Sequence, residues 1–199
     1  MRKGIPAALF TMLSIALLLF APAHAVPADD DDVFVVFSNL RDASTPGGFA
    51  VGLYPFPPPT FNSYALGFPF TPAGSDFRLT QVAVLTSLVH GTNDLLITLY
   101  TDSSGSPGTP LESWSVVNQL GAAVQILSVR PLLHPKLVNG QQYWLVVTMA
   151  VPSSEGIWWI NPIGDVRTQA ASINGGPFAL GPSLSSAFEI RGRRSEDLD

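Results

Sequence analysis

Residues 94–117 read DLLITLYT, DSSGSPGTP and LESWSVV in succession. In the first segment apolar residues occupy every second position, which is the period of a β-strand with one buried face. The middle segment is built from Asp, Ser, Gly and Pro and is typical of a turn. The last segment alternates apolar residues with serine. Together the segments predict a β-hairpin that buries Leu95, Ile97, Leu99, Trp114 and Val116 on one face.

The rest of the chain repeats this pattern of short strands and turns. With 18 Pro and 17 Gly in 199 residues, no window after the N-terminal segment has convincing helical periodicity. We expect a long loop over residues 46–72 with one short strand at 65–70, because prolines cannot donate to a ladder and so exclude a central strand there. The prediction is an all-β fold, a single antiparallel, jelly-roll-like β-sandwich over residues 33–192. Its further strands are expected at residues 33–37, 65–70, 77–85, 124–132, 142–149, 156–161 and 186–191.

Residues 142–149 are apolar in both alternating sets. One set is Tyr143, Leu145, Val147 and Met149, and the other contains Trp144. A strand that is apolar on both faces is typically covered on both sides. We therefore expect this strand to be central and Trp144 to be buried.

The first 25 residues have the three parts of a signal peptide. Arg2 and Lys3 precede a nearly uncharged apolar stretch, and Ala23-His24-Ala25 is a small-x-small cleavage triplet. We expect cleavage before Val26, with an uncleaved anchor helix as the alternative. No later segment has the ~20 continuous apolar residues needed to span a bilayer. The mature chain is therefore expected to be exported, secreted or periplasmic, and to have no membrane partner.

Charge and cysteine content exclude several classes of protein. The chain has no Cys, which excludes a disulfide scaffold, a thiol nucleophile and Cys-ligated metal. Its formal charge of −5 argues against nucleic acid as a partner. Residues 26–32 contain four consecutive acids and are expected to form a disordered leader, with calcium binding as the alternative. Residues 193–199 are expected to be a charged tail. We expect no cofactor.

Catalytic residues are hard to find in this sequence. After residue 25 the only imidazoles are His90 and His134, and no Gly-x-Ser-x-Gly occurs. Both histidines are expected at loop edges, so a Ser-His-Asp triad is disfavoured. Glycoside hydrolysis needs a pair of carboxylates, and the candidates are Asp94, Asp102, Glu112, Glu155, Asp165 and Glu189.

The turn at residues 102–108 has two interpretations. Asp102, Ser104 and backbone carbonyls could supply oxygen ligands to calcium. However, this turn has a single carboxylate, and Asp, Ser, Gly and Pro are also the residues that a turn requires for backbone reasons. We favour the turn and keep Asp102 and Ser104 as candidate metal ligands.

Trp158 and Trp159 are the candidate ligand-binding residues. They are adjacent in a short predicted strand, so their side chains must point to opposite faces. One of them is expected in the core, and the other is then directed toward solvent or a second layer. An exposed Trp ring can stack on a sugar. The alternative is that both rings are buried.

The order of the predicted segments resembles a family of bacterial exported proteins. The resemblance is to the choice-of-anchor domains, most closely the R type associated with PEP-CTERM anchors. It implies a β-sandwich on exported, surface-associated proteins and supplies no catalytic residues. Family members usually carry a C-terminal sorting anchor, and we expect none here because the chain reaches Asp199 without one. The resemblance rests on residues 77–85, LLITLY (95–100), DSSGSPG (102–108), LESWSV (111–116), NGQQYWLV (139–146) and AFEIRG (187–192).

These observations predict a non-catalytic, exported surface or extracellular-matrix module. The expected activity is weak binding of polysaccharide or of another surface component. One alternative is a carbohydrate-active hydrolase that uses a carboxylate pair, and another is a purely structural matrix protein. Two convergent acids in a cleft would favour the hydrolase, and an aromatic strip without acids would favour the binding module.

Overall fold

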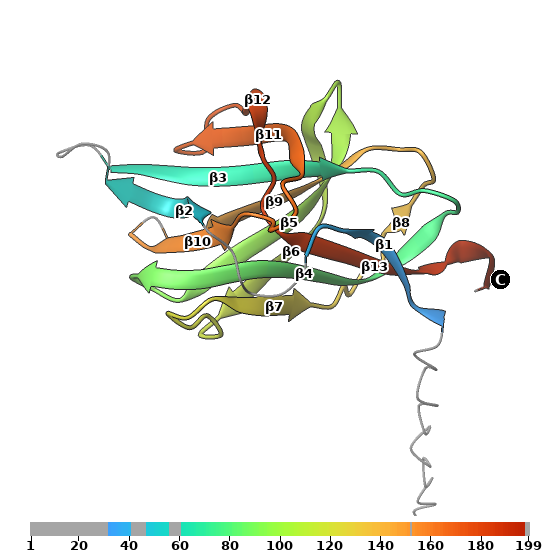
Figure 1. Ribbon diagram of the computed structural model, residues 1–199, viewed down its shortest axis with the longest axis horizontal. Coiled ribbons are helices and arrows are strands. Elements are labelled where there is room, and N and C mark those ends of the chain that lie inside the picture. The colour runs from blue at the N-terminus through green and yellow to red at the C-terminus, as the bar shows by residue number, and fades with distance from the viewer. Residues whose placement is uncertain (1–31, 41–46, 56–60, 152, 198–199) are drawn as a thin grey trace, which may run out of the picture.

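A computed structural model of the chain describes residues 32–40, 47–55, 61–151 and 153–197. In these residues the regular structure is β-strand, apart from short 3-10 turns such as Ser195–Asp197 (Figure 1). All strand pairs are antiparallel, so the all-β antiparallel prediction is confirmed. The strands are β1 (Phe34–Ser38), β2 (Gly48–Pro55), β3 (Phe61–Phe70), β4 (Phe77–His90), β5 (Asp94–Ser103), β6 (Ser106–Val117), β7 (Gln125–Val129), β8 (Lys136–Leu137), β9 (Tyr143–Met149), β10 (Glu155–Trp159), β11 (Val166–Ile173), β12 (Ala179–Leu184) and β13 (Phe188–Arg194).

The strands belong to one sheet that curls into a half-barrel. Its order is β1-β13-β4-β10-β2-β3-β9-β5-β6, with β7 and β8 also on β4, and the β11–β12 hairpin on β3. The first half of β4 pairs with β13 and its second half with β10. In the same way β3 pairs first with β2 and then with β9. The short β10–β2 pair therefore joins the two halves of the sheet. Strands β9, β5 and β6 lie behind β3 and β4 in Figure 1.

The core lies inside the curl and is rich in aromatic rings. Phe70 of β3 contacts Phe188 of β13, with ring centroids 6.2 Å apart. Phe68 meets Trp158 of β10 edge-on at 5.5 Å. These contacts join strands from the two halves of the sheet. The five residues predicted for the buried face of the hairpin are buried as well: Leu95, Ile97, Leu99, Trp114 and Val116.

Strand β9 is central and covered on both faces, as predicted. It lies between β3 and β5. Trp144 is 0% exposed on one face and Tyr143 is 2% exposed on the other. Burial of both alternating sets is what a strand with a neighbouring layer on each side requires.

The prediction of a long loop over residues 46–72 is wrong, although the short strand expected at 65–70 is present as part of β3. This segment contains β2 and β3, and β3 has partners along both edges. Pro69 is opposite Trp144 of β9, and its carbonyl accepts a hydrogen bond from Arg167 Nη1. In a strand, the N–H and the carbonyl of one residue point to the same edge. The N–H that Pro69 lacks would therefore point toward β11, at a position where β11 no longer pairs with β3. The proline therefore removes no bond of the β3–β9 ladder.

Other boundaries also differ from the sequence-based expectation. The β11–β12 hairpin was not predicted, and β13 runs to Arg194, into the expected charged tail. The expected signal peptide and nearly all of the acidic leader lie outside the described residues. Among the residues described, no helix is long and apolar enough to cross a membrane.

Candidate functional site

The tryptophan pair on β10 points to opposite faces, as predicted. Trp158 is 0% exposed, and its indole Nε1 donates a 3.1 Å hydrogen bond to the carbonyl of Ala187. Trp159 is half-buried, and its Nε1 donates to the hydroxyl of Ser87 at 3.0 Å. Within the pair, only Trp159 therefore has ring surface that a ligand could reach.

Asp102 and Ser104 lie where β5 turns into β6. Asp102 Oδ1 accepts hydrogen bonds from Trp144 Nε1 at 2.7 Å and from Gln142 Nε2 at 2.8 Å. Asp102 Oδ2 accepts the N–H of Gly105 at 3.0 Å. Ser104 is exposed in the left-handed region, with φ of 54°. Both oxygens of this carboxylate are thus engaged by neutral donors of the hairpin and of β9.

These contacts shift the titration of Asp102. Burial raises the pKa of its carboxyl, but the hydrogen bonds from Trp144, Gly105 and Gln142 lower it by more. The pKa therefore lies below its ordinary value of 3.8. Among the described residues, no group of three or more His, Asp or Glu side chains is placed to hold a metal ion.

A hollow that we call the side hollow is the most suitable place for a ligand. It has a volume of about 540 Å³ and is formed by β2, β3, β10 and β11. Gly48 of β2 lets Ile157 of β10 pack closely against it, because a Cβ on Gly48 would collide with Ile157. It combines two aromatic rings, aliphatic side chains and two polar groups. Its lining residues are Gly48, Phe49, Ala50, Tyr64, Leu66, Glu155, Ile157, Gln169 and Ala171.

The polar groups of the side hollow are an amide and a carboxylate. Gln169 Nε2 is buried and has no hydrogen-bond partner within the described part of the chain. Glu155 Oε2 lies 3.1 Å from His90 Nε2. A buried donor without a partner costs about 1–3 kcal/mol unless water or a ligand satisfies it. Among the described residues that line it, the hollow thus has a carboxylate acceptor and the side chain of Gln169 beside apolar surface, and no basic side chain.

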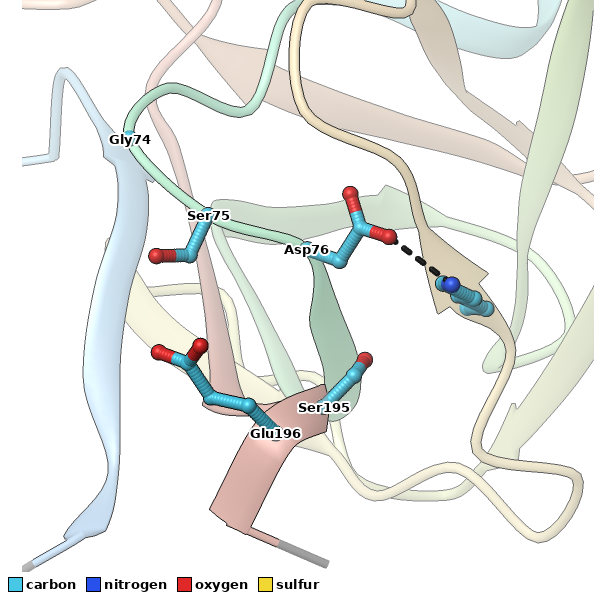
Figure 2. Close-up of a pocket in the computed structure, with 6 residues that line it drawn as sticks. Gly74, Ser75, Asp76, Ser195 and Glu196 are labelled. Atoms are coloured by element: carbon cyan, nitrogen blue, oxygen red, sulfur yellow. Dashed lines mark ion pairs between the residues drawn. The ribbon is translucent and has the colours of Figure 1, made fainter. Parts of the chain in front are cut away.

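A second hollow, the end hollow, is polar and has a volume of about 370 Å³. In Figure 2 the Asp76 side chain points along the dashed ion pair, whose partner is Lys136, while Glu196 points the other way, toward Ser75. The Asp76 carboxylate lies 2.8 Å from Lys136 Nζ and accepts the N–H of Asn139 at 2.9 Å. These hydrogen bonds hold the pKa of Asp76 below its ordinary 3.8. Asp76 is therefore a charged, paired group and not a proton donor at neutral pH.

The other candidate carboxylates and both histidines have local partners. Glu112 accepts backbone N–H groups, Asp94 accepts from Ser115, and Glu189 pairs with Arg191. His134 is exposed, and its Nδ1 lies 3.0 Å from the carbonyl of Leu79. These contacts join neighbouring elements, which is the usual structural role of such side chains.

Sequence reasoning missed the residues of the side hollow. Phe49 and Tyr64 lie in the segment that was expected to be a loop, and Gln169 lies in a hairpin that was not predicted. Residues 166–173 read VRTQAASI and do not alternate apolar with polar side chains, so no clear periodic signal marks this strand. The pairing that brings β11 beside β3 joins distant parts of the chain, and no local pattern encodes it.

Comparisons of the sequence with protein-family models and with curated proteins found no match. The function must therefore be argued from the geometry of the chain itself.

Proposed function

We propose that this chain is a non-catalytic, exported module that binds polysaccharide weakly in the side hollow. The observation that carries the proposal is the side hollow itself, in which the rings of Phe49 and Tyr64 lie beside the polar side chains of Glu155 and Gln169. Sugars present apolar C–H faces and hydroxyl groups together. An aromatic ring can cover the first, and an amide or a carboxylate can bind the second.

Weak affinity follows from the small number of contacts. An aromatic contact contributes ~0.5–1.5 kcal/mol beyond the area that it buries. Two rings and two polar groups in an open hollow therefore suit a polymer that offers repeated contacts, rather than a free monosaccharide. The described residues that line the hollow include one carboxylate and no basic side chain, which favours a neutral polymer over an acidic one.

The proposal extends to architecture and location. We infer that the half-barrel is a variant of the jelly-roll-like β-sandwich, because the two halves of its sheet pack around one aromatic core. The resemblance to choice-of-anchor domains and the signal-peptide pattern support an exported surface or matrix protein.

The test is binding of a neutral glucan by affinity electrophoresis. Tyr64→Ala should reduce retardation by the polymer, and Trp159→Ala on β10 is the aromatic control, because Trp159 does not line the side hollow. If Trp159→Ala alone abolishes binding, the tryptophan is the platform and the side hollow is not. If the wild-type protein binds neither glucans nor acidic polymers, the purely structural role is the better description.

A hydrolase is the second candidate, because Asp76 and Glu196 line the same hollow. Hydrolysis requires one carboxyl that stays protonated near neutral pH and one that is ionised. Asp76 fits only the ionised role. Release of new reducing ends by pure protein, lost in Glu196→Gln, would establish this activity and overturn the non-catalytic proposal.

A further inference from the structure

Glu155 is the one charged side chain among the described residues that line the side hollow. It stands at the start of β10, and its side chain is only 12% exposed. Burying a carboxylate is costly unless a cation or hydrogen bonds satisfy it. In the described part of the chain this carboxylate has a single partner, because its Oε2 lies 3.1 Å from Nε2 of His90.

His90 neutralises the charge of Glu155 only when its ring is protonated. An imidazole changes charge between about pH 5 and pH 8, and the neutral ring offers a hydrogen bond but no positive charge. In slightly alkaline solution the pair therefore keeps the full negative charge of the carboxylate. The hollow thus contains a mostly buried acid whose internal counter-charge is present in acid solution and absent in alkaline solution.

The strands around Glu155 supply no other counter-charge. Strands β2, β3 and β9 contain no charged residue. On β4 the other charged residue is Arg78, at the opposite end of the strand from His90. On β11 the guanidinium of Arg167 lies 2.6 Å from the carboxylate of Asp165 and is already paired. Within the described residues, the charge of Glu155 is therefore balanced by His90 or not at all.

Tyr64 of β3 lies in the same row of the sheet as this acid. Gly52 of β2 is opposite Glu155 on one side and opposite Tyr64 on the other. Neighbouring strands are about 4.8 Å apart, so the backbones of Glu155 and Tyr64 are ~10 Å apart, with no side chain on the residue between them. Both residues line the hollow, so one small group that enters it can contact both.

A carboxylate and an aromatic ring around one hollow are suited to a cation. A positive group is attracted by an aromatic ring when it lies within ~6 Å of the ring centre. The same group can pair directly with a carboxylate, and this pair is stronger where water is partly excluded. A neutral sugar would leave Glu155 without a counter-charge, and an acidic sugar would add a second negative charge beside it.

We propose that the side hollow binds polysaccharides whose sugars carry positively charged amino groups, with the ammonium group held between Glu155 and Tyr64. This inference rests on the proposed polysaccharide binding and names the class of polymer. His90 is an internal competitor, because its protonated ring pairs with Glu155 and so weakens the binding of a cationic sugar.

Two derivatives of one polymer test the preference. Trimethylation of glycol chitosan gives a permanent positive charge, and N-acetylation of the same preparation gives a neutral counterpart. In sedimentation with beads that carry either derivative, at about pH 8, the wild-type protein should bind the trimethylated polymer roughly fivefold more tightly or better. Glu155→Gln should remove most of this difference. Its binding to the neutral derivative should change less than twofold, because Gln has the same size and still bonds hydroxyl groups.

Asp32→Asn is the matched control for net charge. Asp32 is exposed just before β1, and its replacement removes one negative charge, as Glu155→Gln does. Equal losses in the two variants would mean that the polymer is attracted by the whole acidic protein, and would overturn the proposal. Equal affinity of the wild-type protein for both derivatives would overturn it too, while leaving the proposed function in place. Binding of neither derivative would count against both.

The role of His90 is tested by pH. Lowering the pH from about 8 to about 5.5 should weaken binding of the trimethylated polymer by the wild-type protein, because the imidazolium then takes up the carboxylate. His90→Gln cannot gain this charge and should lose less affinity over the same range. Near-UV circular dichroism at each pH separates loss of binding from loss of fold. The same pH dependence in both proteins would overturn the assignment of His90 as the competitor.

Discussion

Asp102 shows how one side chain can determine the geometry of a hairpin. It accepts hydrogen bonds from the turn, through Gly105, and from the adjacent β9, through Trp144 and Gln142. The N–H of Trp144 thus has a partner although its ring is fully buried. A buried indole N–H without an acceptor would destabilise the folded protein. Asp102 provides that acceptor and so allows the Trp144 ring to be buried.

Replacement of Trp144 by Ala should destabilise the protein strongly. The ring is 0% exposed, and deleting a large buried aromatic side chain typically costs 3–5 kcal/mol. Chemical denaturation measures the free energy of unfolding. Trp159→Ala is the control, because that ring is only half-buried and should cost less. A loss below about 1 kcal/mol for Trp144→Ala would contradict the burial described here.

Replacement of Asp102 by Asn should make part of the stability independent of pH. The pKa of Asp102 is lowered on folding, so its contribution is present above the unfolded value of 3.8 and is lost as pH falls through the folded pKa. At pH 7 the variant should be less stable by ~1–2 kcal/mol, because it loses charged hydrogen bonds. The difference from wild type should shrink below pH 3.8. A difference that stays constant from pH 7 to pH 2 would exclude this role for the carboxylate.

The opposite directions of Trp158 and Trp159 could be predicted because alternation along a strand is a local property. Which ring becomes core could not be predicted, since that depends on the side from which Phe68 and Phe188 approach. For the same reason, the sequence could not predict that Tyr64 and Gln169 line one hollow. They meet only because β11 pairs with β3, and sequence patterns do not specify pairing between distant strands.

At the level of elements, β3 shows the limit of proline as a strand breaker. The expectation that prolines exclude a central strand assumes that every residue of such a strand must donate a ladder hydrogen bond to a neighbour. In β3, Pro69 lies past the end of the pairing with β11, so its missing donor affects no ladder bond. The strands with regular alternation, β5, β6 and β9, were all found near their predicted places, because their buried faces are visible in the sequence alone.

Gly52 of β2 should be intolerant of a side chain. Its φ is +80°, and a Cβ there would collide with Met149 and with the carbonyl of Ser154. Gly105 has φ of +81° but open space around it, so it is a matched control. Gly105→Ala should cost ~1–2 kcal/mol of left-handed strain. Gly52→Ala should cost a further ~1–3 kcal/mol for overpacking. Equal unfolding free energies for the two variants would show that β2 relaxes freely around residue 52.

At the level of the whole molecule, the curl of the sheet was not predictable. The sequence indicates strands and turns, and hence an antiparallel all-β protein. It does not show that β4 and β3 each divide their length between two partners. Because of those shared strands, the two halves of the sheet are joined through β10 and β2. The sequence-based expectation was two separate sheets.

Export can be tested directly. The signal-peptide pattern predicts that the mature protein begins at Val26, because Ala23-His24-Ala25 is the cleavage triplet. Mass spectrometry of the periplasm and of the culture medium should find this terminus. Recovery of the uncleaved chain from the membrane fraction would instead support the anchor-helix alternative.

The pairing of β1 with β13 has a mechanical consequence. Phe34 at the start of β1 is opposite Gly192 near the end of β13. The first and last strands of the folded domain therefore begin and end side by side (Figure 1). A force that pulls those ends apart acts across the ladder and breaks its hydrogen bonds one at a time. Such an unzipping load is resisted far less than a shearing load, which strains all the bonds of a strand pair together. Stretched between two attachments, the domain should therefore release β1 at low force while the aromatic core behind it is still intact.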